Sequence, residues 1–324
     1  MIKKIKLDLF KLKSKKNLES VYQFFKKKSE KWFDTTKGSK SDFFTIKKCN
    51  FCNSSSSKLV FEIDSFYYHK CLSCKSLYTK PFLSDESIDS IYSDGMYKVY
   101  QDKLVKKGEK IRKNVLDKRK FEQINMFLSK CNPTLLDVGC GQGTFLNFCR
   151  KKGWRVEGVD PSHSVLQKEI KKNQIKIHIR NFEEIKFNKT FDIITFWGVL
   201  EHLSDPIYNI KKAFELLNKG GMLVFEVPSA ECFISKYLTK YHFSPTRYIE
   251  SGRHNIFFSK NVIEQIATQF DSTIELIESN GLDIQTILFE EFDHENTQKI
   301  INIQDILNDL LLGDHYRVFM KKVN

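Results

Sequence analysis

The stretch Thr134-Leu-Leu-Asp-Val-Gly-Cys-Gly-Gln-Gly-Thr144 decides the fold. Its first half is a short apolar run typical of a buried strand, and Asp137 lies within that run. Its second half carries Gly139, Gly141 and Gly143. Because glycine has no side chain, such a turn lets a ligand approach the backbone at the start of the next helix. The stretch predicts a strand, a ligand-binding turn and a helix at the carboxyl edge of a parallel sheet.

An acid at the end of the next predicted strand supports a nucleoside-type ligand. Asp160 follows the apolar segment 154–159, where a carboxylate can accept hydrogen bonds from both hydroxyls of a ribose. A helix cap is the alternative role, and Pro161-Ser162 fits it as well. A dinucleotide fingerprint requires its third glycine where this chain has Thr144, so the turn departs from that motif.

Short apolar segments alternate with helical patterns from residue 134 onward. Short strands spaced by helices predict an α/β fold whose mostly parallel sheet has helices on both faces. The predicted strands are 134–138, 154–159, 175–179, 191–197, 221–227, 282–290 and 315–322. Residues 84–130 have a largely helical period and form the predicted connector before the first of these strands.

Composition excludes several classes of protein. The 324 residues are 41% hydrophobic and 29% charged with 14 glycines and 6 prolines, which excludes collagen, coiled coils, low-complexity disorder and disulfide miniproteins. The sequence contains no apolar run of the roughly 18 residues that a spanning helix requires, and it does not begin with an apolar signal region. We expect a cytoplasmic protein.

The excess positive charge lies at the N-terminus. Residues 1–48 contain 15 Lys and 5 acids, so they hold +10 of the net +13. Such a segment attracts phosphates on nucleic acid or on anionic lipid, although AT-rich codon usage would also enrich Lys. It could be an interfacial anchor at the inner face of a membrane, a helix that docks on the main domain, or a frayed segment. Its apolar side chains are Ile2, Ile5, Leu9, Leu12, Val21, Phe24, Phe25, Trp32 and Phe33.

Two cysteine pairs predict a structural zinc site. Cys49 and Cys52 form one Cys-x-x-Cys pair, Cys71 and Cys74 form the other, and 18 residues separate them. Each two-residue spacer lets one turn present two sulfurs, and four thiolates bind zinc tetrahedrally. A disulfide framework would require an oxidising compartment. The remaining cysteines, Cys131, Cys140, Cys149 and Cys232, lack ligand spacing.

Residues 134–324 resemble the class I S-adenosylmethionine-dependent methyltransferases. The resemblance rests on the glycine turn, on Asp160, and on the segments 191–194, 199–206 and 217–223. It implies that the turn contacts the methionine part of the cofactor and that Asp160 holds its ribose. It also implies that Asn181 and Phe182 pack on adenine, with Asn181 where the family usually has an acid.

The front of the chain resembles a methyltransferase subgroup in which a four-cysteine module precedes the catalytic domain. Such enzymes often modify sugars or surface polysaccharides, so the resemblance implies a small-molecule, nucleotide-sugar or glycan acceptor. The subgroup's carbon-methylating members have a further C-terminal domain that this chain lacks, which favours oxygen as the acceptor atom. The expected organisation is a basic tail (1–48), a zinc-ribbon-like module (49–81), a helical connector or lid (82–133) and the methyltransferase domain (134–324).

Two histidines are candidate bases for removing a proton from an acceptor hydroxyl. His202 follows the fourth predicted strand of the domain, and His254 lies in a stretch expected to form a lid. His202 could instead pack on the cofactor or cap a helix. Some members of the family bind a metal through Glu-x-x-Glu-His, but Gly198 replaces the first acid here, so we expect no catalytic metal.

Three other functions are alternatives to a methyltransferase that acts on a small-molecule or glycan acceptor. A nucleic-acid methyltransferase would fit the zinc module and the basic tail, but the segment 196–202 lacks the Asp/Asn-Pro-Pro-aromatic turn of enzymes that hold a flipped base. A nicotinamide oxidoreductase fits the glycine spacing less well. A cofactor-binding protein without catalysis is compatible with the same cofactor turn.

Overall fold

The computed structural model places seven strands in one sheet. It describes residues 15–33, 43–45, 48–84, 86–88, 90, 112–128, 130–162, 175–238, 248–250, 252–288 and 297–324. The strand order is β12-β13-β10-β9-β6-β7-β8, and β13 runs antiparallel to both of its neighbours. The strands are β6 (Thr134–Val138), β7 (Arg155–Val159), β8 (Lys176–His178), β9 (Phe191–Trp197), β10 (Leu217–Pro228), β12 (Ser272–Ser279) and β13 (His315–Lys322).

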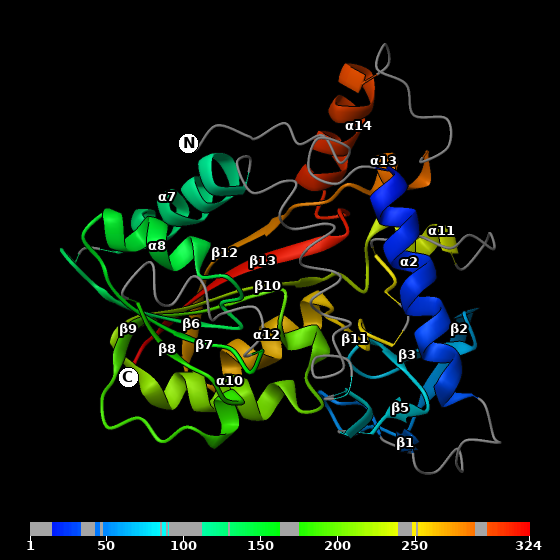
Figure 1. Ribbon diagram of the computed structural model, residues 1–324, viewed down its shortest axis with the longest axis horizontal. Coiled ribbons are helices and arrows are strands. Elements are labelled where there is room, and N and C mark those ends of the chain that lie inside the picture. The colour runs from blue at the N-terminus through cyan, green and yellow to red at the C-terminus, as the bar shows by residue number, and fades with distance from the viewer. Residues whose placement is uncertain are drawn as a thin grey trace.

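Helices cover both faces of this sheet, as the sequence predicts. Figure 1 shows α7 and α8 on one face and α10 and α12 on the other. Neighbouring residues of a strand point to opposite faces, so Leu135 packs with the first group and Leu136 with the second. The helices and helical turns are α2 (Lys15–Ser29), η1 (Glu30–Trp32), η4 (Arg112–Asp117), α7 (Lys118–Phe127), α8 (Thr144–Lys151), η5 (Phe182–Glu184), η6 (Leu200–His202), α10 (Pro206–Leu216), α11 (Phe233–Leu238), α12 (Lys260–Gln269), α13 (Asp283–Ile287) and α14 (Thr297–Asp309).

Local signals explain where two of these helices begin. Asp205 caps α10 by accepting a hydrogen bond from the Tyr208 amide, and Pro206 occupies the first helical position, where it loses no hydrogen bond. Ser259 caps α12 in the same way through the Val262 amide. Helical structure is observed within the expected connector in η4 and α7, and residues 91–111 lie outside the described residues.

One predicted strand is wrong. The segment 282–290 does not form a strand, because its described part contains the helix α13, and the strand beside β13 is β12. The Asp283 carboxylate holds this helix in place by accepting hydrogen bonds from the amides of Ile234 and Asp314. Both partners are distant in sequence, so the apolar run alone could not reveal the helix.

The cysteine region folds as a small antiparallel sheet that is completed from the main domain. Its strands β2 (Ser57–Ile63), β3 (Phe66–Cys71) and β4 (Leu77–Thr79) follow one another in the chain. The fourth strand, β11 (Ile256–Phe257), pairs with β4. A separate two-stranded sheet joins β1 (Phe44–Thr45) to β5 (Phe82–Leu83).

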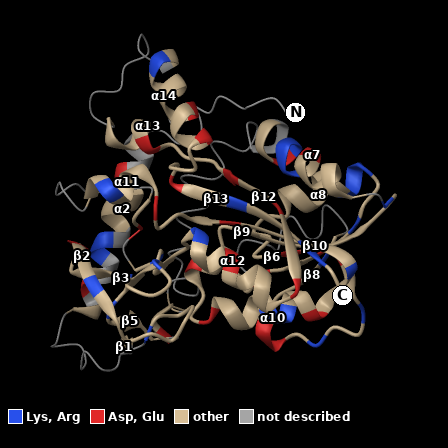
Figure 2. Cartoon of the chain, turned by 180° about the vertical axis from the view of Figure 1, so that it is seen from behind, with Lys and Arg blue, Asp and Glu red and all other residues tan. Residues whose placement is uncertain are grey.

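The described part of the basic tail packs on the cysteine region. Trp32 is 2% exposed and meets Phe66 edge-on, and the Tyr22 hydroxyl donates to Asp64 at 2.7 Å. Figure 2 shows basic segments along α2, whereas charges of both signs alternate over the large sheet and its helices. Residues 15–33 therefore dock on the cysteine region, whereas the docking alternative named the main domain. Ile2, Ile5, Leu9 and Leu12 lie outside the described residues.

None of the helices among the described residues is both long and apolar enough to cross a bilayer.

Candidate functional site

The glycine turn lies where β6 ends and α8 begins. Gly139 and Gly143 both have φ values of +70°, a left-handed conformation that favours glycine. A Cβ at Gly139 would lie 2.3 Å from Val199 Cγ2, so this position cannot take a side chain without displacing the segment after β9. A Cβ at Gly143 would meet nothing within 4 Å. The turn is thus packed against the protein at one glycine and open at the other.

Asp160 holds this turn in place. Its carboxylate accepts hydrogen bonds from the Gly141 amide at 2.8 Å and from the Ser162 amide at 2.9 Å. Burial raises the pKa of Asp160, although these two hydrogen bonds oppose the shift. A carboxylate has about four acceptor positions, so capacity remains for ribose hydroxyls. Asp160 therefore has a cap-like role in the structure, and its role in holding a ribose stays a prediction.

Asp137 lies beneath the turn and is 2% exposed. It accepts a hydrogen bond from Thr195 Oγ1 at 2.6 Å, and burial raises its pKa to about 7.

The two residues expected beside adenine differ in exposure. The Asn181 side chain donates to Glu184 at 3.2 Å in an exposed contact, and Asn181 immediately precedes the turn η5. Phe182 is 3% exposed and packs edge-on against Phe196 with 5.8 Å between ring centres. The Phe182 ring therefore belongs to the core. Asn181 is the more accessible member of the pair, and the contact of both residues with adenine stays a prediction.

A cluster of buried acid and imidazole groups follows β9. The rings of His202 and His254 are 5.1 Å apart, and His202 Nε2 lies 3.9 Å from a carboxylate oxygen of Glu201. His202 Nδ1 is 2.7 Å from the Arg253 carbonyl oxygen, and His254 Nδ1 is 2.8 Å from that of Tyr248. A carbonyl oxygen only accepts hydrogen bonds, so each Nδ1 must carry the proton, and each neutral ring keeps its lone pair on Nε2.

Burial explains the ionisation of this cluster. It lowers the pKa of His202 well below its usual value, with His254 adding to the effect, and it lowers that of His254 to about 4. Burial also raises the pKa of Glu201 to about 8. Both imidazoles are consequently neutral near pH 7, and the Glu201 carboxyl is mainly protonated there.

The stretch that carries His254 is not an exposed lid. His254 and Asn255 are 6% and 1% exposed, and β11 follows them directly. The sequence missed this arrangement because the partner of β11 is β4, which lies far away in the cysteine region.

The cluster can also hold a metal ion. One ligand atom from each of Glu201, His202 and His254 lies within 4.8 Å of the others. Glu201 Oε2 is buried and has no hydrogen-bond partner among the described residues. The expectation of no catalytic metal rested on Gly198 and stays a prediction, although His254 lies close enough to offer a further donor atom.

The four predicted zinc ligands converge. Cys49 and Cys74 sulfurs are 3.5 Å apart, and Cys52 and Cys71 sulfurs are 3.6 Å apart. Four thiolates about 2.3 Å from one zinc ion would be roughly 3.8 Å from each other, so the donor set fits zinc. None of these four cysteines forms a disulfide.

The two cysteine turns share one backbone pattern. The Asn53 amide donates to the Cys49 carbonyl, and the Lys75 amide donates to the Cys71 carbonyl. Asn53 and Lys75 both have positive φ values, of 55° and 66°. This repetition is what two turns that present sulfurs to one ion require.

Sequence reasoning missed Lys120 and Trp197 beside the turn. The Lys120 ammonium lies 4.2 Å from the centre of a Trp197 ring, and its charge helps to lower the pKa of Asp137 against the effect of burial. Burial lowers the pKa of Lys120 itself. Lys120 lies in α7, before the first strand of the domain. Its spacing from the glycine turn matches no motif, so the sequence did not indicate that it lies near Asp137.

The protein-family model for the methyltransferase domain matches residues 108–276 of this chain. The ubiquinone biosynthesis O-methyltransferase of Pelagibacter ubique is 32% identical over 118 residues, which cover 35% of this chain and 48% of that protein. The tRNA U34 carboxymethyltransferase of Campylobacter fetus is 34% identical over 109 residues, covering 32% of this chain and 39% of that protein. The chain therefore spans about half or less of the curated relatives it matches.

A solved structure agrees with the fold at lower identity. The plantazolicin methyltransferase BpumL, in complex with a monoazolic desmethylPZN analog and SAH, superposes with a TM-score of 0.52 at 14% identity. The match covers 73% of this chain and 94% of that protein. This similarity supports the arrangement of strands and helices.

Proposed function

The chain belongs to the methyltransferase-domain family, and from that premise we propose that it transfers the methyl group of S-adenosylmethionine to an acceptor oxygen. The observation that carries the proposal is the open glycine turn fixed by Asp160 at the carboxyl edge of β6 and β7. We assign cofactor binding to the turn and its two acids together with the pair after β8: Asp137, Gly139, Gly141, Gly143, Asp160, Asn181 and Phe182.

Bound S-adenosylmethionine would supply an electrophilic methyl group on a sulfonium. The chain must align the acceptor oxygen with that methyl group, exclude water and remove the hydroxyl proton. We propose that His202 Nε2 takes this proton, because its Nδ1 proton is committed to the Arg253 carbonyl and its ring is neutral near pH 7. In such a transfer the acceptor oxygen would bond to the methyl carbon, the sulfur would leave with the electron pair of the carbon–sulfur bond, and His202 Nε2 would hold the hydroxyl proton.

The acceptor class is proposed on two grounds. Oxygen is favoured because several curated relatives are named O-methyltransferases. A sugar, nucleotide-sugar or glycan hydroxyl is favoured by the resemblance of the four-cysteine module alone. Incubation with labelled S-adenosylmethionine and a panel of nucleotide sugars, catechols and transfer RNA decides the class. Label entering RNA would establish the nucleic-acid alternative.

Calorimetry tests the cofactor assignment. S-adenosylmethionine and S-adenosylhomocysteine should bind, and Asp160→Ala should weaken both by about tenfold or more, because a hydrogen bond to a charged group contributes roughly 1.5–3 kcal/mol. Glu215→Ala, a change of an exposed acid on α10, is the matched control. Binding of a nicotinamide dinucleotide in place of these ligands would contradict the assignment. Cofactor binding without transfer to any acceptor would indicate a non-catalytic binding protein.

A divalent cation on Glu201, His202 and His254 is a second proposal for the same site. The Glu201 oxygen without a described partner and the nearby His202 and His254 nitrogens favour it, because a bound cation would displace the Glu201 proton and satisfy this buried acid. The two proposals exclude each other, since a metal-bound Nε2 cannot accept a proton. Elemental analysis of full-length protein and of Glu201→Gln separates them: a second metal equivalent that disappears in the variant supports the cation.

A further inference from the structure

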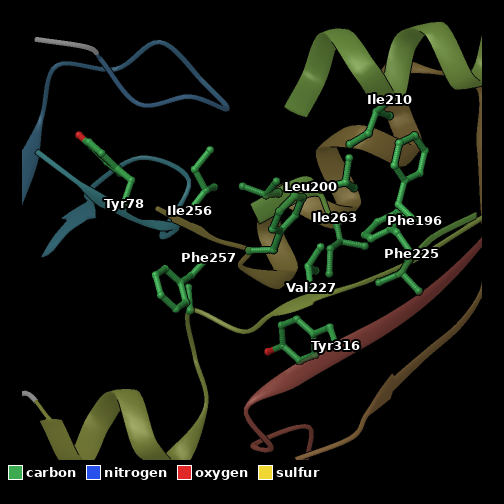
Figure 3. Close-up of a cluster of buried hydrophobic side chains, with 14 of the residues drawn as sticks. Tyr78, Phe196, Leu200, Ile210, Phe225, Val227, Ile256, Phe257, Ile263 and Tyr316 are labelled. Carbon is green, nitrogen blue, oxygen red and sulfur yellow. The ribbon is translucent and has the colours of Figure 1, made fainter. Parts of the chain in front are cut away.

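The segment 252–259 is built jointly by the cysteine region and the main domain. Ile256 and Phe257 pair with Tyr78 and Leu77 of β4. The Phe258 ring packs on Phe51, with 4.6 Å between ring centres. Figure 3 shows Ile256 and Phe257 among the side chains between Tyr78 of β4 and the Phe196–Phe225 pair of the large sheet. One continuous core therefore joins the two regions.

Two polar contacts reinforce this junction. The Asn50 side chain donates to the Ser204 carbonyl at 3.1 Å, which ties the first cysteine turn to the end of the η6 segment. The Ser259 hydroxyl donates to the Cys74 carbonyl, and Ser259 is also the cap of α12. Both cysteine turns thus contact the segments that carry the candidate catalytic histidines.

Asn255 is the central residue of the junction. Its side-chain oxygen accepts from the Thr79 hydroxyl at 3.3 Å, and its carbonyl accepts from the Thr79 amide at 3.0 Å. Its side-chain nitrogen donates to the carbonyls of Gly252 and Arg253, at 3.3 and 3.4 Å, and its amide donates to the Glu201 carbonyl at 3.3 Å. Asn255 and Thr79 are each 1% exposed, so water is not available to replace these bonds.

The Arg253 carbonyl connects Asn255 to His202. This carbonyl accepts hydrogen bonds from the Asn255 side-chain nitrogen and from His202 Nδ1. Its position decides which ring nitrogen of His202 keeps a proton, just as outer partners fix the tautomer of metal-bound histidines. Asn255 also holds the backbone of Glu201, the residue next to His202. The link from Thr79 to His202 therefore consists of two hydrogen bonds to Asn255 and one shared carbonyl.

We infer that Asn255 is a positioning residue through which β4 of the cysteine module fixes the ring orientation and the Nδ1-protonated tautomer of His202. This inference rests on the proposed function for its catalytic meaning. Its structural content is independent of the acceptor and of the cofactor. The module is then part of the active site's framework as well as a metal-binding unit.

Long-range proton–nitrogen NMR of the full chain tests the inference directly. Histidine-labelled protein should show His202, assigned by comparison with His202→Gln, as a single tautomer with the proton on Nδ1. Asn255→Ala and Thr79→Val should each lose this single tautomer, giving exchange between the two forms. Thr79→Ser keeps the hydroxyl and should restore the wild-type pattern. Ser73→Ala, an exposed change in the same module, should have no effect.

Two additional measurements distinguish a change in the His202 tautomer from a general loss of structure. Zinc content and S-adenosylhomocysteine affinity report whether each variant keeps its module and its cofactor site. If Asn255→Ala fails to fold, Thr79→Val decides, because it removes a single hydroxyl. An unchanged His202 tautomer in a folded Thr79→Val protein would overturn the inference. Failure of wild-type protein to bind S-adenosylhomocysteine would contradict the proposed function and leave the tautomer result standing.

Discussion

His202 is the residue on which the proposed chemistry depends most directly. Its replacement in His202→Ala should lower turnover about a hundredfold or more, because general-base catalysis contributes roughly 10²–10⁴-fold. Cofactor affinity should stay close to wild type, as measured by calorimetry with S-adenosylhomocysteine. His254→Ala is the control, because a residue that only shapes the site should change acceptor KM more than kcat. A large loss of cofactor affinity in His202→Ala would instead show that His202 lines the cofactor site and does not act as the base.

The pH dependence of turnover follows from the same imidazole. A base works only when neutral, so activity is present above its pKa and is lost as pH falls through it. Burial lowers the pKa of His202 well below its usual value, and the acid limb of kcat should therefore lie below the pH of about 6.5 typical of exposed histidine. Steady-state rates from pH 4.5 to 8 measure this limb. A midpoint at or above 6.5 would show that another group titrates.

Residues fixed by local spacing were predictable, and residues fixed by distant contacts were not. The turn glycines and Asp160 lie on neighbouring strand ends, so their spacing sufficed. His202 meets the Arg253 carbonyl 51 residues away, and Thr79 meets Asn255 176 residues away. Nothing in the linear pattern distinguishes the buried Asn255 from a surface amide. Asp160 caps the turn through two backbone amides, and its contact with a ribose stays a prediction.

Among the elements, the two cysteine turns are expected to depend on metal. We expect about one zinc per chain by elemental analysis, and Cys71→Ser should lose that zinc together with protease resistance of residues 49–81, because so small a sheet has little core of its own. Cys131→Ser, at an exposed cysteine outside the cluster, is the matched control. Full zinc retention in Cys71→Ser would contradict a four-thiolate site.

A buried ion network holds three strands and a helix together. Arg317 of β13 is 1% exposed and pairs with Glu226 of β10 at 2.6 Å and with Glu278 of β12 at 3.1 Å. It also donates to Gln123 of α7 at 2.6 Å. Arg317→Ala should lower the free energy of unfolding by about 3 kcal/mol, because it removes the buried partner of the partly buried Glu226 carboxylate, whereas Glu278 keeps its pair with Arg119. Urea denaturation measures this loss, and Lys211→Ala in an exposed pair should cost less than about 1 kcal/mol.

The same network predicts sensitivity to acid. Burial opposes ionisation of Glu226, but Arg317 outweighs it and lowers the pKa of Glu226 to about 2. A carboxylate with a lowered folded-state pKa stabilises the protein above its unfolded pKa of about 4.3, and this contribution is lost as pH falls toward 2. Urea midpoints measured across this range should fall less steeply in Glu226→Gln than in wild type.

Across the whole molecule, the sequence correctly predicted the large sheet with helices on both faces. It did not predict how the cysteine region joins that sheet. The large sheet follows from apolar strands spaced by helices, a pattern that local sequence contains. The small sheet takes its last strand, β11, from within the main domain. A two-residue strand such as β11 is too short to be recognised from periodicity. The sequence therefore predicted a boundary between the cysteine region and the main domain, although the two share one hydrophobic core.

The basic N-terminus leads to a prediction about the whole molecule. Residues 15–33 pack on the cysteine region, so the residues before them are the ones to test for a membrane role; residues 1–14 contain five Lys and one Asp. Each basic residue near an anionic surface contributes about 1 kcal/mol, which is enough for reversible binding. Wild-type protein should sediment with vesicles rich in phosphatidylserine, and added salt should release it. A variant beginning at Lys15 keeps the docked helix and should remain in the supernatant. Equal sedimentation of the two proteins would assign any binding to the folded surface, and sedimentation that resists salt would point to apolar insertion.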